Sequence, residues 1–387
     1  MSELARAFLD DEVIAAGWEG AGRVIEEGLA IEARAGEPGE ALRAMVRMLG
    51  ARGLLGLLTD TTDTISWRAV CLARERLGHA SPLLELAFTM QGLGSYALTT
   101  HGTEAQRARW LEPIRRGEHV AAFALTEPEA GSDLSGIATS ARREGDAYVL
   151  EGEKVFISNA GVADTYVLFA ATAPVGERRR LSAFVVPAAS EGLRATPTKV
   201  LGGHPIGSLA LSGVRVPIDQ RIGDEGEGMA IALGTLHRFR TTVGAAAVGF
   251  AQRALDESVR HVKARRQFGQ PLASQQAVQM ALADMACDLE AARLLVYRAA
   301  ALHDDEGFDE RSDQEVTDDQ AAQGSMAKLV ATEAAFRVID RAVQLHGGRG
   351  VMVGHPVARL YEDVRALRIY EGASDIQRLL IARRLLR

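Results

Sequence analysis

Hydrophobic positions recur every three or four residues along the first third of the chain. The spacing is clear in residues 41–49 and 67–73, and it predicts helices from about residue 3 to residue 116. Breaks are expected at Pro38-Gly39, at residues 60–63 and at Gly102, after which Thr103 is suited to cap a helix over residues 104–111. This part of the chain is therefore expected to be helical.

The pattern changes between residues 120 and 216, where short runs of β-branched and aromatic residues are separated by Gly, Pro and Asp. Their close spacing predicts a small, mostly antiparallel barrel or sandwich. Helical spacing returns from residue 228 and predicts a bundle. The strand runs are 148–150, 155–157, 166–169, 184–186 and 209–216, and the later helical segments are 229–266, 274–303, 319–345 and 374–386.

The order helix, sheet, helix predicts an α+β protein with three domains. These are an N-terminal all-helical domain (1–117), a central antiparallel β-barrel or sandwich domain (118–222) and a C-terminal domain resembling a four-helix bundle (223–387). The order lacks the strand-helix alternation of a doubly wound nucleotide-binding fold. The glycine cluster 347–350 does not follow a predicted strand either, so any nucleotide cofactor must be held in another way.

Composition excludes several classes of protein. The net charge of -7 and the lack of a basic stripe disfavour nucleic-acid binding. No apolar run approaches the ~18 residues of a membrane span, and the N-terminus lacks the order of a signal peptide, so a cytoplasmic protein is expected. Cys71 and Cys287 have no partner at metal-ligand or redox spacing; we expect buried thiols and no metal site.

Five motifs follow one another across some 250 residues, and with them the chain resembles the acyl-CoA dehydrogenases. They are Ala122–Asp133 (AFALTEPEAGSD), Phe156–Asn159 (FISN), Arg265–Gly269 (RRQFG), Gln344–Gly348 (QLHGG) and Ile369–Gln377 (IYEGASDIQ). The resemblance covers nearly the whole chain and is weakest before Leu49. It implies an FAD-dependent enzyme, usually a homotetramer built as a dimer of dimers, that acts on acyl-CoA thioesters.

The resemblance implies a flavin-binding set on the predicted sheet. Short hydroxyls such as Thr126 and Ser158 suit hydrogen bonding to the flavin ring, and Phe156 stands where many members have Trp. Taken singly, these residues also fit ordinary turn or core roles. The full set of implied cofactor residues on this part of the chain is Phe123, Leu125, Thr126, Ser132, Phe156, Ile157 and Ser158.

A second set matches positions that reach the FAD of a neighbouring subunit. An arginine beside a glycine segment suits a pyrophosphate, because the guanidinium binds phosphate oxygens and glycine allows close approach. The alternative is an exposed Arg pair with a helix-breaking Gly pair. The residues are Arg265, Gln267, Gln344, Gly347 and Gly348. The resemblance also implies cofactor contacts for Phe268, Gln276, Leu345, Ala373, Ser374 and Asp375; of these, Ala373 and Asp375 depart from the family's usual Thr and Gln.

Desaturation next to a thioester needs one base opposite a hydride acceptor, and Glu371 occupies the family's position for that base. The alternative for Glu371 is a charge ahead of the last helix, where the helix dipole favours acids. Some branches carry the base on the helix of Arg240, but the matching residue here is Phe239, which cannot act as a base.

Other positions match contacts to the thioester, its pantetheine arm or the nucleotide: Ser132, His237, Arg240, Gly372 and Arg383. His237 replaces an Asp of the well-studied members, which leaves coenzyme A and a carrier protein's phosphopantetheine both open.

The resemblance implies α,β-dehydrogenation of an acyl-CoA with electrons passed to an electron-transfer flavoprotein. Alternatives are a flavin oxidase or monooxygenase on the same fold, an acyl-carrier-protein-linked dehydrogenase, and a non-catalytic acyl-thioester-binding scaffold. The acyl group is not readable, although Phe239 and residues 90–96 suggest a short or branched one.

Overall fold

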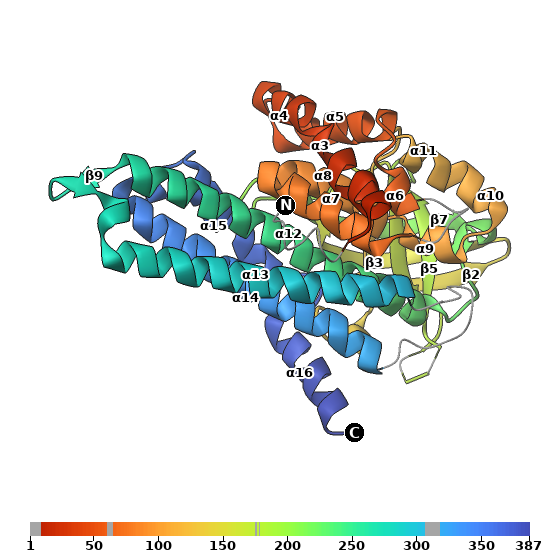
Figure 1. Ribbon diagram of the computed structural model, residues 1–387. Coiled ribbons are helices and arrows are strands. Elements are labelled where there is room, and N and C mark those ends of the chain that lie inside the picture. Colours follow the sequence, from red (N-terminus) through yellow and green to blue (C-terminus); the bar gives the residue numbers. More distant parts are fainter. Residues whose placement is uncertain (1–8, 60–64, 175, 178, 306–317) are drawn as a thin grey trace.

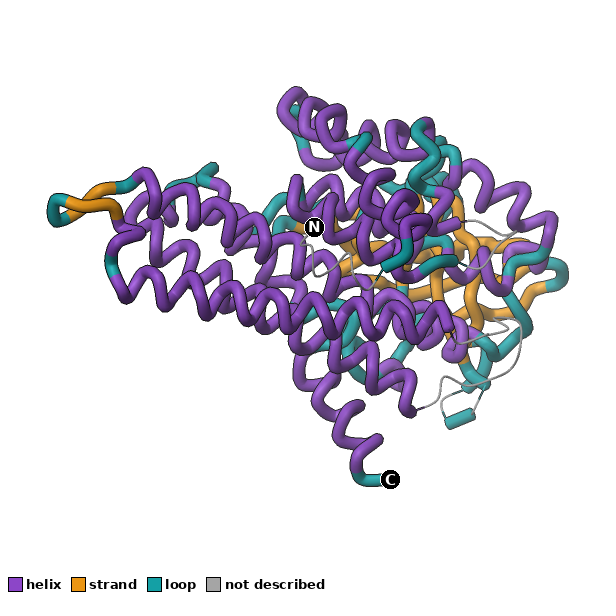
Figure 2. The backbone as a smooth tube through the Cα atoms, in the orientation of Figure 1, coloured by secondary structure: helices purple, strands orange, loops and turns teal. Residues whose placement is uncertain are grey.

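The computed structural model describes residues 9–59, 65–174, 176–177, 179–305 and 318–387. The N-terminal helices cover one side of a sheet, and long C-terminal helices run beneath them and away from the sheet to a small hairpin (Figure 1). Apart from the small hairpin at the tip of the long helical arm, the strands gather at the other end of the molecule (Figure 2). The predicted order of helices, sheet and helices is confirmed.

The N-terminal helices carry the caps expected from their sequence. The Thr103 hydroxyl accepts a bond from the Gln106 backbone N–H, and the Gln106 side-chain oxygen accepts one from the Thr103 backbone N–H, which makes a capping box. The Ser81 hydroxyl caps the buried helix α8 by accepting from the Leu84 backbone N–H. The elements are α2 (Asp11–Val13), η1 (Ile14–Glu19), α3 (Gly20–Gly22), α4 (Ile25–Arg34), α5 (Pro38–Ala51), α6 (Gly56–Thr59), α7 (Trp67–Ala80), α8 (Pro82–Leu93), α9 (Tyr96–His101), α10 (Glu104–Gln106), η2 (Arg107–Leu111) and α11 (Glu112–Arg115).

The central domain is an open sheet with the strand order β6-β7-β3-β2-β4-β5-β8, and β1 pairs with β4. All five predicted strand runs lie in strands. The strands are β1 (Ala121–Ala124), β2 (Ser140–Glu144), β3 (Ala147–Ser158), β4 (Thr165–Ala171), β5 (Leu181–Pro187), β6 (Leu193–Thr198), β7 (Ile206–Pro217) and β8 (Arg221–Ile222), with the 3₁₀ turns η3 (Leu134–Gly136) and η4 (Ile218–Gln220).

A central, mostly antiparallel sheet is present as predicted, but it does not close into a barrel. Closure would require β6 to pair with β8, but β8 has only two residues, and β6 leaves most of its side chains exposed. The pairing is also mixed, because β1 runs parallel to β4 over four residues and β2 meets β4 in parallel at Ser140. The sheet therefore keeps two edge strands, β6 and β8.

The C-terminal domain is a helical bundle, as predicted, with boundaries within two residues of the expected ones. Its helices are α12 (Gly228–Ala264), α13 (Gln276–Asp305), α14 (Asp318–His346), α15 (Pro356–Leu367) and α16 (Ser374–Leu385). The hairpin β9 (Arg266–Gln267) and β10 (Gln270–Pro271) and the turn η5 (Leu272–Ser274) join α12 to α13, and η6 (Gly347–Val351) follows α14. Helix α15 was not predicted, nor were β1, β2, β6 and β8.

The break predicted at residues 60–63 falls outside the described residues, as does most of the interval between the predicted helices 274–303 and 319–345. Cys71 is buried as expected, whereas the prediction for Cys287 is wrong, because this thiol lies on an exposed face of α13. Among the described residues, no helix is long and apolar enough to cross a membrane, and no group of side chains suited to a metal ion is present.

Candidate functional site

Thr126 lies two residues after the end of β1, and Ser158 is the last residue of β3, so both lie where strands of the sheet end; this region is called the sheet edge. The Val155 amide donates to the Thr126 carbonyl at 2.9 Å, which joins the two segments. A register shift between Lys154 and Ile157 accompanies a positive φ of 55° at Phe156 and leaves this ring 66% exposed. Phe123, Leu125 and Ile157 are buried behind the edge, and Ser132 is exposed in the loop before η3.

A buried ion pair fixes this loop from inside. The Lys154 ammonium donates to Glu127 at 2.6 Å and to the Leu125 carbonyl at 3.1 Å. Glu127 also accepts the Ala138 amide at 2.6 Å. Burial lowers the pKa of Lys154 to about 8, while the Glu127 carboxylate opposes that shift. The pair therefore holds the turn on which Thr126 lies.

A cavity of about 640 Å³ opens beside this edge. Phe156, Ser158 and His204 line one part of it, and Tyr370 and Glu85 line another. The His204 Nε2 atom lies 2.8 Å from the Ser158 hydroxyl. Burial lowers the pKa of His204 to about 4, so the ring is neutral at pH 7. His204 was not predicted as a site residue.

Glu371 lies in a tight turn between α15 and α16. Its φ is 51° and that of Gly372 is 93°, so two successive residues adopt the left-handed region. Three side chains fix the turn by donating to its carbonyls: Arg240 to Glu371 at 3.2 Å, and Lys328 and Gln377 to Gly372, each at 2.8 Å. A Cβ at Gly372 would lie 2.4 Å from the Gln377 amide nitrogen, so the close approach requires glycine.

The Glu371 carboxyl is held in a state that suits a base. Burial raises its pKa to about 7, against the opposing attraction of Arg74, Lys328 and Arg240. Its Oε2 atom is buried and has no hydrogen-bond partner among the described residues. A half-buried carboxyl that titrates near neutral pH and keeps a free oxygen can accept a proton from a bound molecule.

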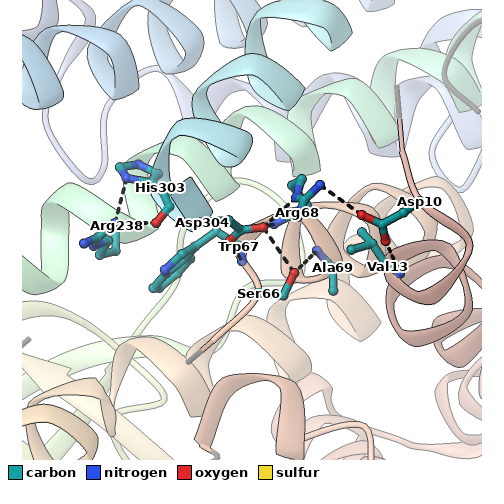
Figure 3. A network of polar contacts seen from close by, with 9 residues as sticks. All are labelled: Asp10, Val13, Ser66, Trp67, Arg68, Ala69, Arg238, His303 and Asp304. Atoms are coloured by element: carbon teal, nitrogen blue, oxygen red, sulfur yellow. Dashed lines mark hydrogen bonds and ion pairs between the residues drawn. The ribbon is translucent and has the colours of Figure 1, made fainter. Parts of the chain in front are cut away.

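Helix α12 carries Arg240 and Phe239 into the same region. Phe239 is fully buried and packs edge-on against Trp67 at 5.6 Å and Tyr96 at 5.8 Å. The start of α7 is tied to α13 because Asp304 accepts the Trp67 amide at 2.5 Å and the Arg68 guanidinium at 2.7 Å (Figure 3). Arg238 bonds His303 at 2.9 Å in the same network.

His237 is buried, and its ring lies edge-on to His303 at 4.9 Å. Burial lowers its pKa well below 6.5, and neither ring nitrogen has a hydrogen-bond partner in the described part of the chain. Its predicted role in substrate contact remains a prediction.

A second cluster of predicted residues lies at the far end of the bundle (Figure 1). The rings of His261 and His346 stack at 4.3 Å, which brings the ends of α12 and α14 together and with them Arg265 and Gly347. Phe268 is 92% exposed at the hairpin tip. Also at this end are the exposed Gln267, Gln276, Gln344 and Gly348 and the half-buried Leu345. Within one chain, this cluster does not join the sheet edge.

The start of α16 lies next to Glu371. Ser374 is buried and donates to Glu333 at 2.7 Å, whereas Asp375 is exposed and pairs with Arg378 at 2.9 Å. Ala373 is half-buried. Arg383 is exposed near the end of α16, which projects from the body of the protein (Figure 1).

Sequence reasoning missed the buried ionic groups that shape the site. These are Arg74, Glu85, Glu127, Lys154 and Lys328; the half-buried Glu333, the amide of Gln377 and the ring of His204 were missed as well. Helical spacing gives only a weak signal for them, namely a charged residue on the apolar face of a helix, as at Arg74. The partners of these groups cannot be read from residue spacing, because paired residues lie far apart in the sequence. Arg240, for example, bonds the Glu371 carbonyl across 131 residues.

Three family models match the chain in order. They are the acyl-CoA dehydrogenase N-terminal domain over residues 1–118, the middle domain over 122–214 and the C-terminal domain over 226–386.

Curated relatives of known name match most of the chain. A 3-(aryl)acrylate reductase of Clostridium sporogenes is 41% identical over 74% of this chain and 74% of its own length. The CarC subunit of a caffeyl-CoA reductase-Etf complex of Acetobacterium woodii is 39% identical over 75% of this chain and 74% of its own length.

Solved structures match the whole fold. A glutaryl-coenzyme A dehydrogenase in complex with glutaryl-CoA has a TM-score of 0.88 and 31% identity, covering 98% of this chain and 96% of the other. An acyl-CoA dehydrogenase of Bacillus anthracis complexed with FAD has a TM-score of 0.85 and 29% identity, covering 98% of this chain and 67% of the other.

Proposed function

The chain belongs to the acyl-CoA dehydrogenase family of FAD-dependent oxidoreductases acting on CH-CH bonds, and from this premise we propose that it desaturates an acyl-CoA between Cα and Cβ. The observation that carries the proposal is Glu371, a carboxyl with a pKa of about 7 and a free buried oxygen, on a turn fixed by three side chains. The reverse reaction, reduction of an enoyl thioester, would use the same residues, with Glu371 as the acid.

The residues at the sheet edge fit FAD. The exposed ring of Phe156 and the hydroxyl-bearing Ser158 line a cavity of about 640 Å³, which is large enough for a planar ring system. Thr126 lies on the segment that is bonded to Val155, next to Phe156 in the chain. We assign the isoalloxazine to this edge, with Phe123, Leu125 and Ile157 supporting it from behind. When bound, FAD supplies the acceptor for the hydride.

Glu371 acts in this proposal as the base. Its carboxylate takes the proton from Cα, and the electron pair left at Cα forms the Cα–Cβ double bond. Bound FAD would accept the hydride that Cβ loses. The backbone N–H of Glu371 polarises the thioester carbonyl as negative charge develops on it. Gly372 allows the substrate to approach the turn closely.

The turn itself needs fixing because a base displaced by about 1 Å loses much of its effect. Arg240, Lys328 and Gln377 hold its two carbonyls, so the position of the Glu371 side chain is set before substrate binds. For the rest of the substrate, Ser132, His237, Arg240 and Arg383 remain proposed contacts to the thioester, its pantetheine arm or the nucleotide.

A second subunit completes the proposed cofactor site. Arg265 and Gly347 lie at the end of the bundle that is distant from the sheet, so they serve a neighbouring chain's FAD. The large apolar side chains at that end support an interface: Phe268 is 92%, Val351 71% and Val353 101% exposed. We propose a dimer as the smallest active unit and a dimer of dimers as the assembly.

For the electron acceptor we propose an electron-transfer flavoprotein. Support comes from the relative named as a subunit of an Etf complex. An oxidase on this fold would keep Glu371 as the base and would differ in the access of oxygen to the flavin. A dehydrogenase acting on a carrier-protein thioester would differ only in the carrier of the acyl group.

The test is anaerobic titration of the purified holoenzyme with straight, branched, cyclic and aryl acyl-CoAs while the flavin absorbance is followed. Bleaching by one class supports the proposal, and rapid return of colour in air would indicate an oxidase. A yellow protein that no acyl-CoA bleaches contradicts it.

A further inference from the structure

A buried polar cluster of Arg74 on α7 and of Glu85 and Thr89 on α8 lies beside the cavity, and Glu85 is its member that lines the cavity. Arg74 is 0% exposed, and Glu85 and Thr89 are each 3% exposed. The Arg74 Nε atom donates to Glu85 Oε1 at 2.6 Å, and Glu85 lines the cavity. Most of the remaining positions of α8 are apolar, so the ion pair is placed in a hydrophobic layer at the cost of desolvating two charges.

One atom of the cluster, Nη2 of Arg74, is fully buried and has no partner in the part of the chain that the structure describes. The Thr89 hydroxyl interacts with the Glu85 carboxyl. The other terminal nitrogen of Arg74 donates to the Thr242 hydroxyl of α12, so the guanidinium is fixed on two sides. A fixed buried donor without an acceptor carries a desolvation penalty that a bound group can remove.

The cluster lies close to the proposed chemistry. Tyr370 lines the same cavity as Glu85 and directly precedes Glu371 in the chain. The charges of Arg74 and Glu85 both act on the Glu371 carboxyl, in opposite directions. An acyl chain with its α-carbon at Glu371 can therefore extend past Tyr370 and end at Glu85.

Building on the proposed function, we propose that Arg74, Glu85 and Thr89 form the distal end of the acyl pocket and select an acyl group that carries a hydroxyl. A hydroxyl matches the cluster because it accepts from Arg74 and donates to Glu85. A carboxylate would face Glu85 and Glu371 in a medium of low dielectric constant, and an ammonium would face Arg74. A plain alkyl end would leave the buried Nη2 atom of Arg74 unpaired.

The test compares matched pairs of acyl-CoAs in anaerobic flavin reduction by the holoenzyme. The pairs are 5-hydroxypentanoyl with pentanoyl, 6-hydroxyhexanoyl with hexanoyl, and 3-(4-hydroxyphenyl)propanoyl with 3-phenylpropanoyl, and glutaryl-CoA serves as the anionic probe. In at least one pair, the specificity constant is expected to be at least about tenfold higher for the hydroxylated member. The variants Glu85→Gln and Arg74→Met/Glu85→Leu should lower that ratio toward one.

A matched control separates this role from a merely structural one. Glu75 and Arg293 form another buried ion pair from α7, at 3.0 Å, with both side chains 2% exposed and neither lining the cavity. Arg293→Met should lower stability and leave the hydroxyl preference unchanged.

Equal rates within all three pairs, or a preference for glutaryl-CoA, would overturn the inference while leaving the dehydrogenase function in place. An unchanged ratio in Glu85→Gln would do the same. Failure of every acyl-CoA to reduce the flavin would overturn the proposed function itself, and the inference with it.

Discussion

The rate of flavin reduction should depend on pH through Glu371. Burial raises the pKa of this carboxyl to about 7, and only the ionised form accepts the α-proton. For a pKa near 7, about a tenth of the carboxyls are ionised at pH 6 and about nine tenths at pH 8, so the rate should rise roughly tenfold between them. An unburied glutamate would be almost fully ionised throughout this range.

The assay is anaerobic stopped-flow reduction at low substrate concentration, because the second-order rate constant reports the free enzyme's pKa. Lys328→Met should move the midpoint to higher pH, because the Lys328 ammonium stabilises the ionised Glu371. Arg142→Met, which alters an exposed side chain on β2, should leave the midpoint in place. A rate of flavin reduction that is constant from pH 6 to pH 8 would show that no base with a pKa near 7 controls this step.

Three other outcomes are expected. Lys154→Met leaves Glu127 buried without its cation and should lower the free energy of unfolding by about 3–5 kcal/mol in denaturant titration. Arg142→Met, which breaks an exposed ion pair, should change the free energy of unfolding by less than about 1 kcal/mol. Equal losses in the two variants would contradict this prediction. Gln377→Leu removes a donor to the Gly372 carbonyl and should slow flavin reduction about 10- to 100-fold with an unchanged visible spectrum; a rate within twofold of the parent would count against a fixed turn. Phe268→Glu places a charge on a 92% exposed ring and should give a smaller species in sedimentation, so an unchanged mass would argue against an interface there.

Local patterns predicted the architecture well. Helical spacing located α12, α13, α14 and α16 to within two residues, and the capping box at Thr103 began the expected helix. Whether the sheet closes into a barrel could not be predicted, because closure depends on how distant edge strands meet. Nothing in the sequence of the mostly exposed β6 or the two-residue β8 specifies their partners. Helix α15 begins with a Pro at its first position, a common start signal, and was missed despite that signal.

The motifs placed the candidate residues without their surroundings. Glu371 was located from its resemblance alone, but the carbonyl bonds from Arg240 and Lys328 come from helices 131 and 44 residues away in sequence. The raised pKa follows from that packing and cannot be read from the motif. Buried ionic groups such as Lys154 are unpredictable for the same reason, since burial depends on tertiary contacts.

The role of Glu371 as the base is tested most directly by anaerobic flavin reduction in Glu371→Gln, with the acyl-CoA that best reduces the parent enzyme. The substitution keeps the size of the side chain and removes its basicity. If Glu371 is the base, the variant is expected to be a yellow protein with bound FAD and a normal fold, in which flavin reduction by the substrate is slowed by about 10²-fold or more. Reduction at the parent rate would show that Glu371 is not the base.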